Sequence, residues 1–454
     1  MSFPRYPAYK DSGVEWLGEV PEHWEGLRLR FAVTLNPSKQ EAKSYADDDL
    51  VSFLPMEAIG EDGSLSLEIE KEVGECLNGY TYFKEGDVCI AKITPCYENG
   101  KGAILRGLKG GIGFGTTELI VARPRTEIMT AQFLDYLFRS STFRSLGEAA
   151  MYGAGGQKRV PDSFVRDFAS FLPPVGEQIA IATFLDRETA KIDALIAEQQ
   201  RLIELLQEKR QAVISHAVTK GLNPDAPMKD SGVEWLGEVP EHWTVMPLRL
   251  AARIESGHTP SRSREDYWVA DECVYPWFTF GDVWQIRDGR TEYVFETQEK
   301  VSQIGLDNSA ARLLPVNTVI LSRTASVGFS GILGAPMATT QDFVNWICSP
   351  RISPEYLLYV FRAMAKEFER LKYGSAHNTI YMPDIFSFRA PVPPLDEQRQ
   401  IVSMVRESLR QLDGSFDDLL KSQELLQERR SALISAAVTG QIDVRGLVPE
   451  AVGA

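Results

Sequence analysis

Polar loops that could bind nucleic acid recur at five places in the sequence. Residues 92–94, 97–101 and 323–326 follow strand-like runs, and residues 153–159 and 374–379 lie further along each half of the chain. Between them they carry Arg, Lys, Asn and Gln, the side chains that form paired hydrogen bonds with base edges. Their glycines allow a backbone to approach a groove closely. These residue types fit two interpretations, loops that read DNA and ordinary loops on a protein surface.

No segment carries a recognisable catalytic motif. Residues 100–102 (GKG) lack the upstream glycine and the hydroxyl of a phosphate-binding loop, and the glycine-rich residues 110–115 run into a strand-like segment, not into a helix. The Pro-Pro pairs follow Leu172 and Val392, where an adenine-methyltransferase motif needs Asn or Asp. His377 has no Ser, Cys or Asp partner at a known catalytic spacing. We therefore predict no catalytic residue, no metal site and no cofactor in this chain.

Composition narrows the class of protein. The 454 residues are enough for two to four domains, and a formal charge of −15 excludes a basic protein that coats DNA. The charge is uneven, because residues 76–171 contain 12 basic and 9 acidic side chains. Five cysteines include no Cys-x-x-Cys pair, which is typical of reduced thiols in the cytoplasm. No apolar run approaches the roughly 20 residues of a membrane span, so we expect a cytoplasmic protein without membrane contact.

The sequence segments that must position these loops occur twice in the chain. Residues 10–24 and 229–243 both read KDSGVEWLGEVPEHW, 219 positions apart. Residues 172–178 match 392–398 as Pro-Pro-x-x-Glu-Gln, and residues 204–219 match 424–439 at 12 of 16 positions. Each half thus consists of an opening segment, a variable domain and a long helix. This arrangement predicts an internal repeat with pseudo-twofold symmetry.

The two variable stretches share little identity but both predict mixed α/β structure. Alternating runs at 87–93, 118–122, 318–322 and 343–348 predict strands, and residues 131–146 and 354–371 each predict one helix. Weak correspondences place residues 86–88 with 317–319, and residues 115–118 with 338–341.

Two long helices are predicted, from Gly176 to Val218 and from Asp396 to Val438, because these runs contain almost no helix-breaking residue. Apolar residues recur in them at multiples of seven. They are Leu185, Ile192, Leu206, Val213, Val405, Leu412, Leu419, Leu426 and Leu433. A pair of core helices and a mutual antiparallel coiled coil both fit this pattern. The same helices also fit a surface that binds a partner's helices.

The arrangement as a whole resembles a known family. Two variable domains alternate with two helices opened by Pro-Pro-x-x-Glu-Gln, and each half begins with Val-Glu-Trp-Leu-Gly-Glu-Val-Pro-Glu-His-Trp. In these features the chain resembles the specificity subunit of type I restriction-modification systems, and the resemblance covers essentially its whole length. It implies an α+β fold in which two mixed α/β target recognition domains are separated by two long helices that form an antiparallel coiled coil.

The resemblance also implies a function. Each recognition domain would read one half of a bipartite, asymmetric site on double-stranded DNA, and the helices would set the spacer. Two methyltransferase (modification) subunits and two restriction/translocase subunits would join the chain in phage defence. S-adenosylmethionine, ATP and Mg would be bound by those partners, and the chain itself would not be an enzyme.

By position, the resemblance maps DNA binding to the polar loops and to two hydroxyl runs. The candidates are Lys92, Thr94, Asn99, Lys101, Thr116, Thr117, Gln157, Lys158, Arg159, Arg323, Thr324, Ser326, Thr339, Thr340, Gln341, His377, Asn378 and Tyr381. The heptad residues named above are the candidate partner interface.

The predicted organisation has seven parts. They are an opening segment (1–24), the first recognition domain (25–171), the first helix (172–220), a linker with the repeated opening segment (221–243), the second recognition domain (244–391), the second helix (392–440) and a C-terminal tail (441–454). Two alternatives stay open at this stage, a protein–protein scaffold without DNA readout and a fused restriction–methylation enzyme. Trp16, Trp24, Trp235 and Trp243 of the opening segments are either core anchors or partner contacts.

Overall fold

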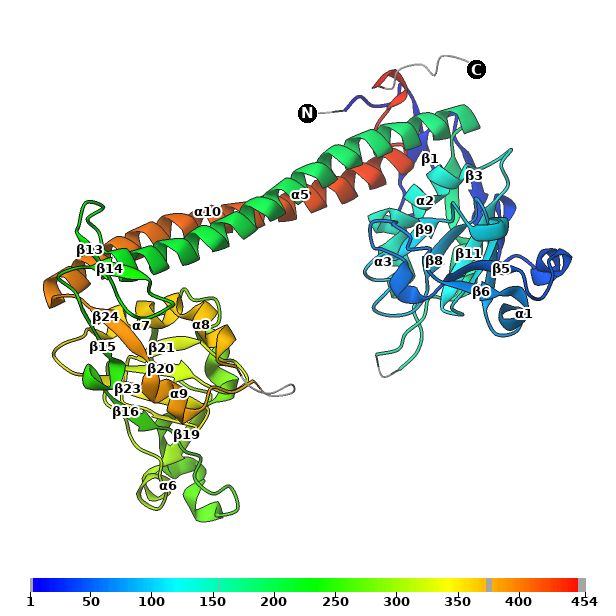
Figure 1. Cartoon of the computed structure of the whole chain (residues 1–454). Helices are drawn as coiled ribbons and strands as arrows, with labels where there is room; N and C mark the ends of the chain where they lie inside the picture. The colour runs from blue at the N-terminus through cyan, green and yellow to red at the C-terminus, as the bar shows by residue number, and fades with distance from the viewer. Residues whose placement is uncertain (1–2, 155, 373–377, 448–454) are drawn as a thin grey trace. The chain divides into compact units, whose positions relative to one another are not determined.

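The computed structural model describes residues 3–154, 156–372 and 378–447 (Figure 1). The chain divides into two compact units. Unit 1 consists of Met1–Gln199 with Leu420–Ala454, and unit 2 consists of Gln200–Leu419. In unit 1 the blue N-terminal and red C-terminal segments lie together (Figure 1), and the backbone N–H of Asp443 donates to the carbonyl of Pro4 (2.8 Å). Each unit combines sheets with helices, which confirms the predicted α+β class.

Unit 1 contains two four-stranded sheets. Their strand orders are β6-β5-β10-β7 and β4-β11-β8-β9, and two-stranded pairs β1-β2 and β12-β3 flank them. The strands are β1 Tyr9–Asp11, β2 Glu19–Pro21, β3 Glu25–Arg28, β4 Val33–Leu35, β5 Leu50–Leu54, β6 Glu70–Glu72, β7 Thr81–Lys84, β8 Val88–Ala91, β9 Gly102–Ile104, β10 Ile112–Gly115, β11 Leu119–Pro124 and β12 Ala169–Leu172. The short helices are α1 Val73–Cys76, α2 Ala131–Arg139, α3 Ser141–Ala149 and α4 Asp162–Asp167.

The glycine-rich residues 110–115 include strand β10, and the strand-like run predicted after them is β11. A Cβ atom at Gly113 would lie 2.4 Å from the Phe83 ring and 2.8 Å from the Ser52 carbonyl oxygen. Such contacts are too short for any side chain, so glycine is required for β10 to lie between β5 and β7. The glycines therefore have a packing role.

Unit 2 contains a five-stranded sheet, β16-β23-β20-β21-β18, and a three-stranded sheet, β19-β17-β22. Two further pairs are β13-β14 and β15-β24. The strands are β13 Met228–Asp230, β14 Glu238–Pro240, β15 Thr244–Pro247, β16 Ala252–Ser256, β17 Cys273–Phe278, β18 Tyr293–Val294, β19 Glu299–Ser302, β20 Thr318–Ser322, β21 Ser330–Leu333, β22 Ala338–Thr339, β23 Phe343–Cys348 and β24 Arg389–Val392. The short helices are α6 Gln303–Asp307, α7 Pro354–Ala363, α8 Ala365–Arg370 and α9 Met382–Ser387.

The single helix predicted at the end of each variable domain is wrong in both units, because each is broken into two. Residues 131–146 form α2 and part of α3, separated at Ser140, whose backbone is extended and whose Oγ accepts from the N–H of Phe143 at 3.3 Å. A serine side chain that caps a new helix competes with continuation of the old one. In unit 2 the break falls at Met364, between α7 and α8.

The two predicted long helices are confirmed as α5 (Val175–Lys220) and α10 (Leu395–Val438). Within unit 1, Asp193 pairs with Arg430 (2.8 Å) and Gln199 donates to Ser422 (2.8 Å). Within unit 2, Arg210 of α5 pairs with Asp413 of α10 at 3.2 Å. In each unit the helices therefore pair in antiparallel directions.

Four of the nine heptad residues are buried and five are half-buried. The buried ones are Leu185, Ile192, Val405 and Leu433, and the half-buried ones are Leu206, Val213, Leu412, Leu419 and Leu426. Leu185 and Leu433 belong to the core of unit 1, and Val405 to the core of unit 2. The seven-residue pattern thus serves helix pairing and domain packing together.

Candidate nucleic-acid interface

Three polar segments of unit 1 converge at the end of strand β8. The backbone N–H of Lys92 donates to the carbonyl of Glu118 (2.9 Å), and the carbonyl of Lys92 accepts from Val160 (2.8 Å). Two residues later, the N–H of Thr94 donates to the carbonyl of Lys158 (3.0 Å). The loop after β8, the turn between β10 and β11, and the segment before α4 therefore form one surface, which we call cluster 1.

An ion pair braces cluster 1. The guanidinium of Arg159 donates from Nε and Nη2 to the carboxylate of Glu118 at 2.8–3.2 Å. These hydrogen bonds lower the pKa of Glu118 below its usual range. Arg159 also bridges Tyr152 and Ile93 through its backbone. Its side chain is therefore held by the protein, and Glu118, which the sequence analysis did not single out, is the residue that holds it.

Other candidates in cluster 1 divide into engaged and exposed side chains. Lys101 donates from Nζ to the carbonyl of Met56 (3.1 Å), which joins the segment after β5 to the cluster. Thr94 donates to the carbonyl of Gly156 (2.6 Å) and accepts from the N–H of Lys158 (3.1 Å). Lys92 and Thr116 are half-exposed. The fully exposed candidates, which are best placed to reach a ligand, are Asn99, Thr117, Gln157 and Lys158.

Unit 2 builds the same arrangement from different side chains. The N–H of Arg323 donates to the carbonyl of Asp342 (2.8 Å), and the carbonyl of Arg323 accepts from Ile380 (2.9 Å). The N–H of Ala325 donates to the carbonyl of Asn378 (2.9 Å). These three bonds reproduce those of Lys92 and Thr94 in cluster 1. We call this surface cluster 2.

The matching hydrogen bonds correct one alignment made from the sequence. Residues 115–118 correspond to 339–342, one position later than the 338–341 predicted. The N–H of Thr116 donates to Leu54 and that of Thr340 to Phe278, each at the end of a strand that runs parallel to its neighbour. Asp342 is consequently the counterpart of Glu118. A register set by backbone pairing is not visible where two stretches share so little identity.

The candidates of cluster 2 also differ in accessibility. Arg323 is half-exposed, and its Nε donates to the carbonyl of Gln341 (3.0 Å). The exposed Gln341 accepts from Thr259 (2.6 Å). Thr339 is only 1% exposed and pairs with Asn345 (2.9 Å).

The remaining candidates of unit 2 complete this picture. Thr340 and Ser326 are buried, and Thr324 is half-exposed. Asn378 and Tyr381 are exposed, whereas His377 lies outside the described residues. The structure thus brings most of the polar candidates to one surface in each unit, while their contact with DNA stays a prediction.

The repeated motifs form hydrogen bonds that hold each opening segment against the first turn of a long helix. In unit 1, Glu177 in the first turn of α5 accepts from Trp24 Nε1 (3.0 Å) and Tyr6 OH (2.7 Å), and the His23 ring nitrogen lies 2.8 Å away. In unit 2, Glu397 of α10 accepts from Trp243 Nε1 (3.0 Å), with the His242 ring nitrogen at 2.9 Å.

The adjacent glutamines have an equally structural role. Gln178 donates to the carbonyls of Ile128 (2.8 Å) and Pro173 (3.0 Å), and Gln398 makes the equivalent bonds to Arg351 and Pro393 (both 2.8 Å). The Glu-Gln pair of the Pro-Pro-x-x-Glu-Gln motif therefore fastens each long helix to its unit.

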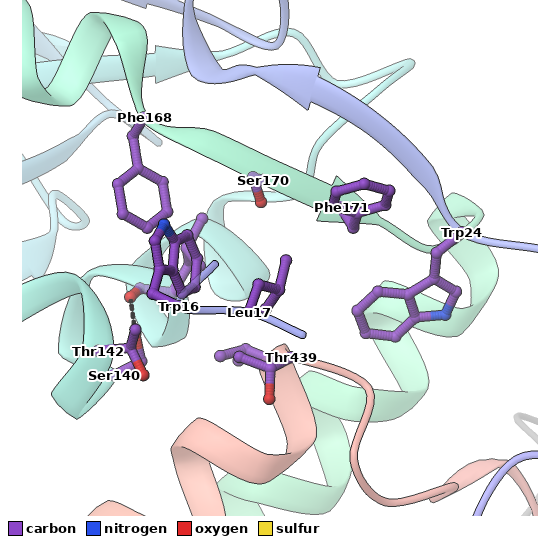
Figure 2. Close-up of a pocket in the computed structure, with 11 residues that line it drawn as sticks. Trp16, Leu17, Trp24, Ser140, Thr142, Phe168, Ser170, Phe171 and Thr439 are labelled. Carbon is purple, nitrogen blue, oxygen red and sulfur yellow. Dashed lines mark hydrogen bonds between the residues drawn. The ribbon is translucent and has the colours of Figure 1, made fainter. Parts of the chain in front are cut away.

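A small apolar cavity lies behind the first opening segment (Figure 2). Trp16, Leu17, Trp24, Phe168 and Thr439 are among its lining residues, and the Trp16 and Phe168 rings lie 5.2 Å apart. Its volume is about 10 Å³, the space that one water needs. Trp24 and Trp243 are buried and Trp16 and Trp235 partly so, which favours the core role for these tryptophans.

Within the described residues, no group of three or more His, Cys, Asp or Glu side chains is arranged to hold a metal ion. No helix in the described part of the chain is long and apolar enough to cross a membrane.

Comparison with known proteins finds a family model that matches part of this chain. Residues 240–423 match the family model described as "Type I restriction modification DNA specificity domain". The match begins in the repeated opening segment of unit 2 and includes cluster 2. These residues are therefore similar to the DNA specificity domains that this model describes.

Several similar proteins are themselves type I restriction enzyme specificity subunits. The EcoEI and EcoAI type I restriction enzyme specificity subunits of Escherichia coli are each 42% identical over 189 residues, which is 41% of this chain. That match spans only 31% of each relative's length. The MjaVIII specificity subunit of Methanocaldococcus jannaschii is 24% identical over 438 residues, covering 94% of this chain and 95% of the relative. The predicted resemblance to type I specificity subunits is thus confirmed.

Solved structures share the fold. A chain from a type I R-M system superimposes with a TM-score of 0.74 at 17% identity, over 92% of this chain and 98% of that one. The HsdS subunit from Thermoanaerobacter tengcongensis gives a TM-score of 0.55, also at 17% identity, over 93% and 98% of the two chains. This chain therefore shares its fold with both of these solved chains.

Proposed function

We propose that this chain is the DNA-recognition subunit of a type I restriction-modification complex, in which each unit reads one half of a bipartite, asymmetric site. The observation that carries the proposal is the construction of clusters 1 and 2. The same backbone hydrogen bonds join the same three segments in both units, yet the side chains differ. Lys92 is replaced by Arg323, and Lys158 by Asn378.

Such a pair of clusters is suited to reading two different sequences in one docking mode. Lys and Arg pair with guanine, whereas Asn and Gln pair with adenine. Lys158 and Gln157 of cluster 1 and Gln341 and Asn378 of cluster 2 are exposed side chains of these types. Because the side chains differ, the two half-sites differ, and the whole site is not a palindrome.

The chain has no activity of its own in this proposal. It binds double-stranded DNA as part of a complex with two methyltransferase subunits and two restriction/translocase subunits in the cytoplasm. Those partners bind S-adenosylmethionine, ATP and Mg and carry out the chemistry. The net charge of −15 supports a division of labour in which partners supply much of the phosphate contact.

The paired helices set the spacer between the half-sites and dock the methyltransferase subunits. Their antiparallel pairing within each unit supports this role. An α-helix rises about 1.5 Å per residue, so one added turn in both helices should lengthen the spacer by one or two base pairs. An unchanged spacer would contradict the role of the helices as a ruler.

The proposal is tested by mapping methylated bases across the genome, by single-molecule sequencing, in cells that express this chain with its neighbouring methyltransferase. A two-part asymmetric motif with a fixed gap, lost on deletion of this chain, is expected. A motif that survives the deletion, or the absence of any motif, would favour a protein–protein scaffold instead.

A further inference from the structure

Unit 2 exposes aromatic side chains on a short 3₁₀ helix, η8 (Phe280–Gln285), beside cluster 2. Trp284 is 64% exposed and Phe280 is 49% exposed. Among the eight tryptophans, all of which lie in the described residues, Trp284 alone is exposed. Neighbouring exposed apolar side chains, as opposed to single ones, are the kind of surface that marks an interaction site.

The helix η8 is attached to cluster 2 at both of its ends. It begins two residues after Phe278, whose carbonyl accepts from the N–H of Thr340 (3.1 Å). Just beyond its other end, the guanidinium of Arg287 lies over the ring of Phe329, 5.9 Å from its centroid. Phe329 follows directly on the loop that contains Arg323. The aromatic surface is therefore continuous with the candidate DNA-reading loops.

The backbone of η8 is held firmly, so the exposed side chains are presented in a fixed direction. Thr279 and Asp282 form a capping box, and the buried carboxylate of Asp282 also accepts from the N–H of Gln298 (2.8 Å). The buried residues Asp282, Val283 and Ile286 anchor one face of this segment. Phe280 and Trp284 of η8, and Arg287 just after it, are exposed.

The charge beside the aromatic pair favours an anionic partner. Arg287 is exposed and takes part in no ion pair with another described residue. The carboxylate of the neighbouring Asp288 accepts instead from the N–H of Arg290 (2.9 Å). Aromatic rings flanked by an available cation suit a polyanion that also offers apolar surface, such as the thymine methyl groups and sugars of duplex DNA.

We propose that Phe280, Trp284 and Arg287 form a second DNA-contact element of unit 2, which packs against the half-site read by cluster 2. This inference rests on the proposed function. The rings make apolar contact with bases or sugars, and Arg287 contacts a phosphate. Trp284 and Phe280 thereby contribute to the affinity for that half-site.

The test uses the chain assembled with its methyltransferase subunits and a fluorescein-labelled duplex that carries the mapped site. We expect Trp284→Ala, and Phe280→Ala separately, to raise Kd about tenfold by fluorescence anisotropy. Val274→Ala is the matched control, because Val274 is 57% exposed near the opposite end of strand β17, and it should change Kd less than twofold. When the half-site read by unit 2 is scrambled, variant and wild type should bind equally.

Three results would overturn the inference. If the double variant Phe280→Ala/Trp284→Ala binds the site with a Kd within twofold of wild type, the proposed contact does not exist. Loss of methyltransferase subunits from that variant on size-exclusion chromatography would make the patch a protein interface. Equal binding of specific and scrambled duplexes by the wild-type complex would instead refute the proposed function, and the inference with it.

Discussion

Replacement of Glu177 by alanine tests whether the hydrogen bonds between the opening segment and the long helix stabilise unit 1. The substitution leaves two buried donors, Trp24 Nε1 and Tyr6 OH, without their acceptor. A buried polar group that loses its partner costs about 1–3 kcal/mol, so Glu177→Ala should destabilise unit 1 by about 4 kcal/mol. The equivalent Glu397→Ala leaves one such donor, Trp243 Nε1, and should destabilise unit 2 by about 2 kcal/mol.

Thermal and urea unfolding followed by circular dichroism measure both variants. For domains of this size each kcal/mol lowers Tm by roughly 2–4 °C, so the first variant should melt about 8–16 °C below wild type. Glu177→Gln, which keeps an acceptor oxygen, is the conservative control and should lose less. Glu177→Ala within 1 kcal/mol of wild type, or a larger effect at Glu397, would refute the reasoning.

Three further predictions concern pH, backbone conformation and DNA affinity. Burial raises the pKa of Glu292, but hydrogen bonds from Arg406 and Tyr359 lower it more, to a net value below the ordinary 4.5. The ionised Glu292 carboxylate therefore stabilises the fold fully above pH 4.5, and this stabilisation is lost as the pH falls through its lowered folded-state pKa. The loss of unfolding free energy caused by Glu292→Gln, measured by urea unfolding at pH 7, should therefore shrink in acid; an unchanged loss would contradict this. Gly86 has a φ of +84° with no atom near its missing Cβ, so Gly86→Ala should cost about 1 kcal/mol in unfolding free energy, whereas Asn317→Gly, at the equivalent turn, should be nearly neutral; equal effects would be inconsistent with a strain argument. The isolated chain should bind duplex DNA with Kd weaker than about 1 μM at physiological salt, and tight binding by anisotropy would show that partners are not needed for phosphate contact.

The repeated architecture was accessible to sequence reasoning because its signals are local. Proline pairs, an unbroken run of helix formers and a seven-residue apolar pattern predict α5 and α10 without knowledge of any distant contact. Alternating apolar residues likewise predict strands such as β20 and β23, whose bounds agree with the runs 318–322 and 343–348.

The composition of the candidate site was less accessible, because it depends on contacts between distant residues. Glu118 and Arg159 are 41 positions apart, and only the fold shows that one holds the other. Thr339 is a plausible base reader by type, yet it lies at the buried end of β22. The partners of Glu177 are about 150 positions away, so the motif carries no local signal of its role.

The short helices show the same limit at a finer scale. Residues 131–146 have one continuous helical pattern, but the side chain of Ser140 caps a second helix and breaks the first. A serine that faces solvent in a helix and one that caps the next helix look alike in sequence. The choice between them is made by how α2 and α3 pack into the core.

The central claim is that each unit reads its own half of one DNA site. It is tested most directly by replacing residues 25–171 with the corresponding stretch of a different specificity subunit and mapping methylation genome-wide in cells that carry the methyltransferase. The account predicts a motif in which one half changes while the other half and the spacer are retained. A motif that changes in both halves, or in neither, would contradict it.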